Sequence, residues 1–399
     1  MDRKKNYRLL ILCLVILDLI AAVWLGYRYL NRKIPDELYV SEGQEQQVKN
    51  VLDHPLLSFD DAITVSGDGS YLLSSRIFGL IPFKNVKIIP ADSTSVLVSG
   101  NTVGIYMKTE GVLVVDTGEI ISQNGTMEDP AKNIVKPGDY IVAFNDQTVH
   151  SKKELMNDLK ELESENVELG VVREGENIQL SLTPVKDTKG EYKLGIWVRD
   201  NTQGIGTLTF VSENGAYGAL GHGISDVDTG ELLNIQNGSL YQAQIVGIHK
   251  GSSGSPGELA GLIQYETEKV IGSIEKNCEQ GIYGELSEIS SDLDLQKMKI
   301  SYKQEIEIGP AAVRCCVDGR VREFEAEITR IDMNHEDTNK SFVIHITDPE
   351  LLQITGGIVQ GMSGSPVLQN GRIVGAVTHV LVNDPTRGYG IFIENMLEH

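Results

Sequence analysis

The segment GMSGSPVLQNGRIVGAVTHV, from Gly361 to Val380, carries the most informative pattern in the chain. Small residues surround Ser363, so the backbone can turn sharply there and expose the hydroxyl. The same turn would point the N–H groups of Gly361 and Ser363 toward one point, which is the arrangement of an oxyanion hole. A β-rich run with an Asn-Gly turn follows, and such runs are typical of an all-β domain.

This pattern resembles the G-x-S-G-[GS]-P motif of chymotrypsin-like peptidases. Gly375–Thr378 likewise resembles the G-x-V-S-type end of the strand that follows this motif. The resemblance implies a double β-barrel with Ser363 as the nucleophile. It also implies that the strand edge at Thr378 pairs with the substrate backbone, and that His379 lines the pocket for the residue before the scissile bond.

A second segment has the same letters. Gly251–Pro256 also reads G-x-S-G-S-P, so the motif alone does not identify the nucleophile. The residues GELAGLIQ that follow it indicate the start of a short helix, whereas a β-rich run follows Ser363. Ser253 also lies only 31 residues after His222, which is the favoured base. The sequence therefore favours Ser363 over Ser253.

Serine is a poor nucleophile unless a base activates it. His222, within GALGHGI at Gly218–Ile224, is flanked by small residues that permit close approach by a substrate and by Ser363. The two residues are far enough apart in sequence to come from separate half-barrels. His54 and His150 lie outside the predicted catalytic region, and the remaining histidines lack this glycine setting. The sequence predicts His222 as the base, the alternative being a structural histidine in a turn.

A third residue would orient the imidazole. Four aspartates are available for this role: Asp226, Asp228, Asp348 and Asp384. Asp348 ends an apolar strand and keeps the order His, Asp, Ser along the chain, so we choose Asp348. The alternative is that it only forms an Asp-Pro turn.

The N-terminus predicts a membrane anchor. Leu9–Tyr27 is apolar apart from Asp18, and at about 1.5 Å per residue it reaches nearly across a bilayer core of about 30 Å. Basic residues before this run favour an N-in orientation. No convincing cleavage site follows, which favours a retained anchor over a signal peptide. Residues 34–399 are therefore expected outside the cytoplasmic membrane.

Composition argues against several partners. The chain has 56 Asp+Glu against 35 Lys+Arg, which is unfavourable for binding nucleic acid. Of its four cysteines, Cys13 lies inside the apolar N-terminal run. The other three, Cys278, Cys315 and Cys316, cannot all pair and show no C-x-x-C spacing, so neither a disulfide scaffold nor a zinc site is indicated. No cofactor or metal is expected.

Residues 96–190 resemble a PDZ domain. Ser151 and Glu154 form a predicted capping box at the start of a helix, and a hairpin is expected around Glu174. By this resemblance, Gly104-Ile105-Tyr106-Met107 stands where the carboxylate-binding loop would be, beside an open strand edge for a peptide. The alternative is a PDZ-like spacer that only packs on its neighbour.

The expected architecture is therefore mainly β. It comprises a cytoplasmic N-terminus and transmembrane helix (1–33), a stalk with a short β-rich segment (34–95), a PDZ-like domain (96–190) and a chymotrypsin-like double β-barrel peptidase domain (191–399). Two helical stretches are expected within the last part, at Gly257–Leu262 and Ser287–Leu295.

The segments GALGHGISD, ITDPELL and GIVQGMSGSPV, together with the anchor and the PDZ-like unit, resemble the stage IV sporulation protein B peptidase family of endospore-forming bacteria. The resemblance implies a catalytic triad of His222, Asp348 and Ser363. It also implies an enzyme that acts in the space between forespore and mother cell, cleaves itself and then cleaves a membrane-bound regulator of an intramembrane protease. That cleavage would lead to activation of a sigma factor.

Two other functions fit the same features. The chain could be a non-catalytic signalling adaptor with a PDZ domain, or a general envelope quality-control protease. Proteases of the second kind usually place the PDZ domain after the catalytic domain, whereas here the order is reversed. Loss of output in Ser363→Ala would separate a peptidase from an adaptor.

Overall fold

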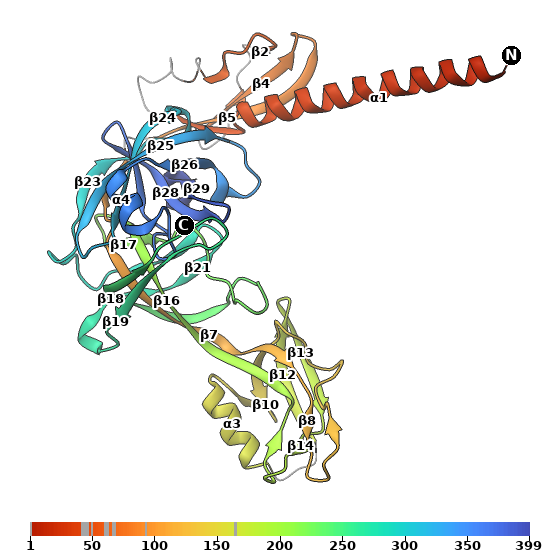
Figure 1. Cartoon of the computed structure of the whole chain (residues 1–399), viewed down its shortest axis with the longest axis vertical. Helices are drawn as coiled ribbons and strands as arrows, with labels where there is room; N and C mark the ends of the chain where they lie inside the picture. The colour runs from red at the N-terminus through yellow and green to blue at the C-terminus, as the bar shows by residue number, and fades with distance from the viewer. Residues whose placement is uncertain are drawn as a thin grey trace.

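The computed structural model describes residues 2–40, 48, 51–59, 64–65, 69–91, 94–162 and 166–399. The chain is mainly β, with an apolar N-terminal helix that projects from the body (Figure 1), as the sequence predicts. The helix, α1 (Asp2–Lys33), is the only one in these ranges that is long and apolar enough to cross a membrane.

A small sheet follows α1 within the segment predicted as a stalk and short strands. Its strands are β1 (Glu37–Val40), β2 (Leu57–Phe59), β3 (Thr64–Val65), β4 (Tyr71–Ile77) and β5 (Ile81–Pro90). Apolar side chains on β1 and β5 form a small core with Ile34, which directly follows α1. Part of the predicted stalk, at 41–47, 49–50, 60–63, 66–68 and 92–93, lies outside the described residues.

The PDZ-like module has its own core. It contains β8 (Ile120–Ile121), β9 (Met127–Glu128), β10 (Tyr140–Phe144), β11 (Gln147–Thr148), α3 (Lys152–Lys160), β12 (Val167–Arg173), β13 (Glu176–Leu182), β14 (Val185–Lys186) and β15 (Tyr192–Lys193). The Ser151 hydroxyl caps α3 by accepting from Glu154 N at 3.2 Å, as predicted. The Glu154 carboxylate reaches back to His150 N at 2.8 Å, one residue before the N-cap. The predicted hairpin joins β12 to β13.

Two long strands join this module to the peptidase region. These are β7 (Thr102–Thr117) and β16 (Ile196–Val211), which pair with each other along most of their length. Figure 1 shows them running from the lower module into the upper body. The first half of β7 pairs with peptidase strands, so the PDZ-like module begins within β7 rather than at residue 96.

The remaining strands before residue 300 extend the sheet that contains β7 and β16, where the first barrel was expected. They are β6 (Ser95–Val98), β17 (Ala216–Ala219), β18 (Ile235–His249), β19 (Glu258–Ile263), β20 (Val270–Ile274), β21 (Lys276–Cys278), β22 (Gly281–Glu285) and β23 (Gln296–Lys299). A short 3₁₀ helix, η1 (Thr267–Lys269), precedes β20. The two helices predicted here are absent from these residues: Gly257–Leu262 lies largely in β19, and Ser287–Leu295 contains a hydrogen-bonded turn, Leu293 N to Ser290 O at 3.2 Å, but no helix. Pairing with β18 overrides the local helix preference of GELAGL.

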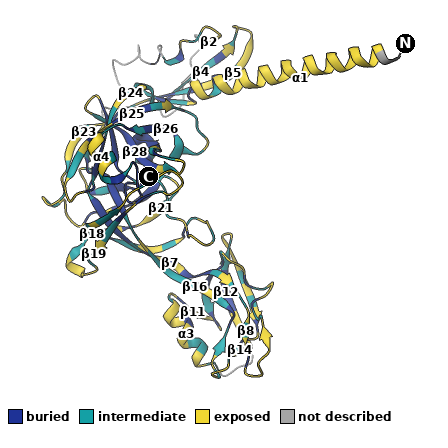
Figure 2. Cartoon of the chain, viewed as in Figure 1, coloured by how far each residue is buried: buried dark blue, intermediate teal, exposed yellow. Residues whose placement is uncertain are grey.

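The C-terminal part is a closed barrel. Its strands are β24 (Gly309–Cys316), β25 (Val321–Ile331), β26 (Phe342–Ile346), β27 (Pro366–Gln369), β28 (Arg372–Leu381) and β29 (Asp384–Phe392). The helical elements here are η2 (Lys303–Glu305), η3 (Thr338–Lys340), α4 (Pro349–Thr355) and α5 (Ile393–Leu397). Burial concentrates in this body, while the surface of α1 is exposed (Figure 2).

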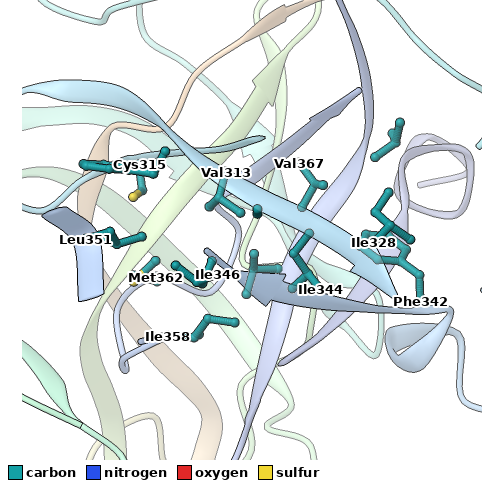
Figure 3. Close-up of a cluster of buried hydrophobic side chains, with 14 of the residues drawn as sticks. Val313, Cys315, Ile328, Phe342, Ile344, Ile346, Leu351, Ile358, Met362 and Val367 are labelled. Carbon is teal, nitrogen blue, oxygen red and sulfur yellow. The ribbon is translucent and has the colours of Figure 1, made fainter. Parts of the chain in front are cut away.

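The barrel core holds the loop between α4 and β27 in place. Val313, Phe342 and Ile344 are fully buried, and Met362 belongs to the same cluster, where Figure 3 shows it near Ile346, Leu351 and Ile358. Because Met362 precedes Ser363, its burial fixes one side of the turn that carries the predicted nucleophile.

Candidate active site

Ser363 lies on a glycine-dependent turn. Gly361 and Gly364 have φ angles of 97° and 91°, in the left-handed region where other residues are strained. A Cβ at Gly364 would lie 2.2 Å from the Thr207 carbonyl oxygen on β16. The two glycines therefore allow the loop to turn sharply and to lie against the preceding sheet.

Contacts with β16 orient the carbonyl groups of this loop. The Thr207 hydroxyl donates to Gly361 O at 2.8 Å, and Thr207 N donates to Ser363 O at 3.0 Å. Within the described residues, neither Gly361 N nor Ser363 N donates a hydrogen bond. The two N–H groups predicted to form the oxyanion hole are thus available to a ligand.

The Ser363 hydroxyl already has a partner on β28. It donates to the Thr378 carbonyl oxygen at 2.9 Å. The Thr378 side chain is buried and donates to Asn339 O at 2.6 Å, which fixes this part of β28. Ser363 must therefore exchange Thr378 O for a base before it can act as a nucleophile.

His222 comes from the preceding sheet, on the turn after β17. Leu220 and Gly221 both have φ near 69°, and the turn lies against the barrel because Gly221 faces Thr378. The His222 Nδ1 atom lies 2.8 Å from Gly223 O. A carbonyl oxygen can only accept, so Nδ1 carries the proton in this contact and Nε2 keeps its lone pair. That tautomer is the one a general base needs.

His379 packs against the His222 ring. The two ring centroids lie 4.9 Å apart at an interplanar angle of 36°. Burial lowers the pKa of His222, although its bond to Gly223 O partly opposes this. Burial, and then the positive charges of His222 and Lys340, lower the pKa of His379 to about 4. Both rings are consequently neutral near pH 7.

The structure thus brings His222 and Ser363 to two adjacent residues of β28. His222 comes from the first half of the peptidase region, and Ser363 comes from the second. Ser363 contacts Thr378, and His222 contacts the neighbouring His379. No hydrogen bond joins Ser363 and His222 directly in the part of the chain that the structure describes.

Asp348 is engaged elsewhere. It is the N-cap of α4, where its Oδ1 accepts from Glu350 N at 2.9 Å and from Leu351 N at 3.0 Å. Its Oδ2 accepts from Glu325 N at 3.3 Å. Across the described ranges no hydrogen bond joins Asp348 to His222, so the predicted triad is not assembled in this conformation, because the cap contacts occupy this carboxylate.

The other three candidate aspartates also have different partners. Asp226 is buried and pairs with Arg199, which also binds Asp228, while Asp384 accepts from the Thr386 hydroxyl at 2.6 Å. The group that orients the His222 imidazole here is a backbone carbonyl. No residue type in the sequence marks this carbonyl group for that role.

Ser253 lies in a different setting. Its hydroxyl donates to Asn383 O at 2.9 Å, and Gly254 N donates to Val382 O at 2.8 Å. The second G-x-S-G-S-P segment therefore forms a turn between β18 and β19 that holds this hairpin against the turn between β28 and β29. Among the described ring contacts and hydrogen bonds, none brings a histidine to Ser253.

The family model of the SpoIVB peptidase S55 matches residues 190–397, just over half of the chain, and this range includes His222 and Ser363. The chain belongs to the SpoIVB peptidase S55 family. It is therefore a serine endopeptidase, as the sequence predicted.

Comparisons with other proteins add little to this S55 assignment. The PDZ domain of the SdrC-like protein from Listeria monocytogenes has a TM-score of 0.19 and 20% identity, covering 22% of this chain and 87% of that one. The Rv3671c protease in its inactive form has a TM-score of 0.26 and 12% identity, covering 49% and 81%. No match to a curated protein was found.

The prediction of a carboxylate-binding loop at Gly104–Met107 is wrong for this S55 peptidase. Gly104, Ile105, Tyr106 and Met107 lie in the middle of β7 and pair with β16 on one side and β18 on the other. Ile105 and Met107 are buried in the core of this sheet. Since both edges are paired, no row of N–H groups is left for a peptide terminus.

A groove with a volume of about 740 Å³ lies instead between α3 and the start of β16. Leu155, Leu159 and Met156 line its helix side, and Leu194-Gly195-Ile196 lines the other. At Ile196–Val198, β16 pairs only with β7 among the described strands, so its second edge faces the groove. The sequence contained a signal for this groove: Gly195, between Leu194 and Ile196, lies directly before a strand that begins with a β-branched residue.

A second groove adjoins the candidate active site. It has a volume of about 560 Å³ and is lined by Gly361, by Gln203–Ile205 of β16 and by β19. Leu259 N donates to Gln360 O at 2.9 Å, and Gln360 N donates to Gly257 O at 2.8 Å. Because this ladder stops at Gln360, the rest of β19 borders the groove with an edge that the nucleophile loop does not cover.

Proposed function

We propose that Ser363 is the nucleophile and His222 the general base of this peptidase. The observation that supports this most is their meeting at Thr378–His379, beside the unused N–H groups of Gly361 and Ser363. The neutral His222 has an Nε2 lone pair that can accept the Ser363 proton.

The reaction is an acyl transfer. His222 Nε2 takes the proton from Ser363 Oγ as Oγ bonds to the carbonyl carbon of the substrate, and the developing oxyanion accepts hydrogen bonds from Gly361 N and Ser363 N. The protonated imidazole then gives its proton to the leaving amine. Thr378 and His379 form the substrate edge next to the scissile bond. Asp348 remains the residue predicted to orient His222 in the triad. To take that role, its carboxylate would have to release the N-cap hydrogen bonds of α4.

The proposed substrates are proteins, including the chain itself and a membrane-bound regulator of an intramembrane protease in sporulation signalling. The family name supports the sporulation role. The apolar run of α1 and the basic residues at the start of this helix support a body held outside the cytoplasmic membrane. The resemblance to the sporulation peptidase family supports its placement in the space between forespore and mother cell. The groove between α3 and β16 supports capture of a substrate peptide by the PDZ-like domain.

A serine-directed fluorophosphonate probe tests the site. We expect the full chain in detergent micelles to be labelled, Ser363→Ala and His222→Ala to lose labelling, and Ser253→Ala to keep it as the matched control. Mass spectrometry of new N-termini, with wild type and Ser363→Ala compared, tests self-cleavage. Labelling that survives Ser363→Ala and is lost in Ser253→Ala would overturn the assignment. A signalling output that Ser363→Ala leaves intact would favour the adaptor.

A further inference from the structure

The turn between β4 and β5 exposes large apolar side chains. Phe78 is 68% exposed, Leu80 is 79% exposed and Ile81 is 59% exposed. The segment RIFGLIPFK, from Arg76 to Lys84, contains no acidic residue in a chain whose net charge is −21. Contiguous apolar side chains of this size at one protruding turn mark a surface that contacts something other than water.

The turn is held firmly in this exposed position. Phe78 N donates to Leu56 O at 2.8 Å, and Leu80 N donates to Ile77 O at 3.1 Å. Phe78 has a φ of 53°, which is uncommon for a bulky residue. The hairpin therefore presents its apolar tip at some conformational cost instead of folding it inward.

The hairpin runs beside α1. Lys84 Nζ donates to Asn31 Oδ1 at 3.3 Å, and the Phe83 ring contacts Tyr27 edge-on, with centroids 5.5 Å apart. Moving one residue along β5 toward the hairpin turn, from Lys84 to Phe83, thus moves the contact by about one helical turn of α1 toward its N-terminus, from Asn31 to Tyr27. Figure 1 shows β4 and β5 beside the end of α1 that meets the body. The tip of the hairpin consequently points in the direction of the apolar part of the helix.

The residues of α1 at this level are typical of a membrane interface. Trp24, Tyr27 and Tyr29 lie there, and the Arg28 guanidinium lies 4.8 Å from the centroid of the Trp24 ring. Aromatic residues gather where acyl chains meet headgroups, since their rings are apolar and their polar atoms stay wet. Phe78, Leu80 and Ile81 lie beyond Phe83 along the same direction, which places them at the depth of this belt.

We propose that the β4–β5 turn, Phe78–Ile81, inserts into the lipid interface beside α1 and forms a second membrane contact. A single helix leaves the attached body free to rotate about the helix axis. A second contact beside it would fix which face of the body looks at the bilayer. The apolar side chains would leave water on insertion, which is favourable in proportion to the area they bury.

Tryptophan quenching by brominated lipids tests this placement. The full chain is reconstituted at low protein density in phosphatidylcholine vesicles brominated near the glycerol end of the acyl chain. The reporter is Leu80→Trp in a Trp24→Phe, Trp197→Phe background, and Phe78→Trp in the same background is a second reporter. The native residues supply the controls: Trp24 alone reports the anchor, and Trp197 alone, 57% exposed in the PDZ-like module, reports the distant body.

We expect both hairpin reporters to be quenched to an extent similar to that of Trp24, and Trp197 to keep its emission. Since these vesicles contain no other protein, quenching comes from lipid and not from a partner helix. Unquenched hairpin reporters beside a quenched Trp24 would overturn the proposal, and equal quenching of Trp197 would do so as well. Fluorophosphonate labelling of Ser363 in each variant checks that the chain is folded.

Discussion

The two nitrogens of His222 have different surroundings. Nδ1 is committed to Gly223 O, and the ring packs against His379 in a partly buried site. Burial disfavours the charged imidazolium, so the pKa of His222 lies below its usual value of about 6.5. A base that is neutral over a wider pH range can accept the Ser363 proton without first losing one of its own.

The pH dependence of turnover follows from this. A base with a lowered pKa stays unprotonated to a lower pH, so the midpoint of the acid limb in the pH profile of kcat/KM should lie below pH 6.5. His379→Ala uncovers the His222 ring and should move the limb upward, toward about 6.5. His379→Phe keeps a ring over His222 and is the matched control. A limb that sits at or above 6.5 in the wild type would contradict the reasoning.

The Asp348 carboxylate could cap α4 or act in the catalytic triad, and two substitutions separate these roles. Asp348→Ala removes the cap of α4 and should lower the free energy of unfolding by about 1 kcal/mol, whereas Asn is a good N-cap and should spare most of it. Thermal unfolding measures both variants. Activity of Asp348→Asn then tests the predicted triad: a loss of kcat at unchanged stability would show that the negative charge acts in the reaction.

The motif letters around Ser363 predicted the local geometry of its turn, because small residues permit the backbone angles found there. The glycines at 361 and 364 have the positive φ angles that small residues around Ser363 indicated. The orienting partner of His222 was not predictable, because every residue has a carbonyl group and nothing in the letters distinguishes Gly223. The alternative considered for Asp348 was an Asp-Pro turn, whereas in the structure this aspartate caps α4 and the proline begins the helix.

At the scale of elements, β19 is the strand that borders the nucleophile loop. A Cβ added at Gly257 would lie 2.3 Å from His249 O and 2.7 Å from a Val359 methyl group. Gly257→Ala should therefore push β19 away from Gln360, cost about 1–3 kcal/mol of stability and reduce kcat. Gly247→Ala, whose Cβ would meet only Ala260 at 3.8 Å, should change neither value. Urea unfolding and peptidase assays of both variants check this, and equal effects would contradict it.

Elements with strong local signals were predicted correctly, and those set by distant partners were not. The cap at Ser151 needs only its own helix, so its letters sufficed. GELAGL has helix-favouring residues but forms β19, since β18 provides a strand to pair with. Gly104–Met107 was assigned to a peptide-binding loop by the resemblance to PDZ domains, whereas two partner strands hold it extended.

At the scale of the whole molecule, β7 runs from the peptidase sheet into the PDZ-like module. Its pairing with β16 breaks between Lys108 and Leu113, where contacts with β18 and β10 continue. Lys108 pairs with Asn201 and Asn237, Glu110 N donates to Asn234 O at 3.0 Å, and Val112 pairs with Ile141. The module should thus move with the body as one piece. Hydrogen exchange should show slow amides without a gap through Lys108–Val112, and fast exchange there would indicate a flexible linker instead.

The two strands that connect the module to the body, β7 and β16, determine how the enzyme can be truncated. Cutting the gene at residue 96 would divide β6, and starting it at residue 190 would remove β7, on which β16 and β18 pair, so a simple truncation would give misleading results. Lys108 and Asn201 face each other across two antiparallel strands. Replacing everything between them with a two-residue Asn-Gly turn would excise the module as a loop and leave a continuous sheet behind.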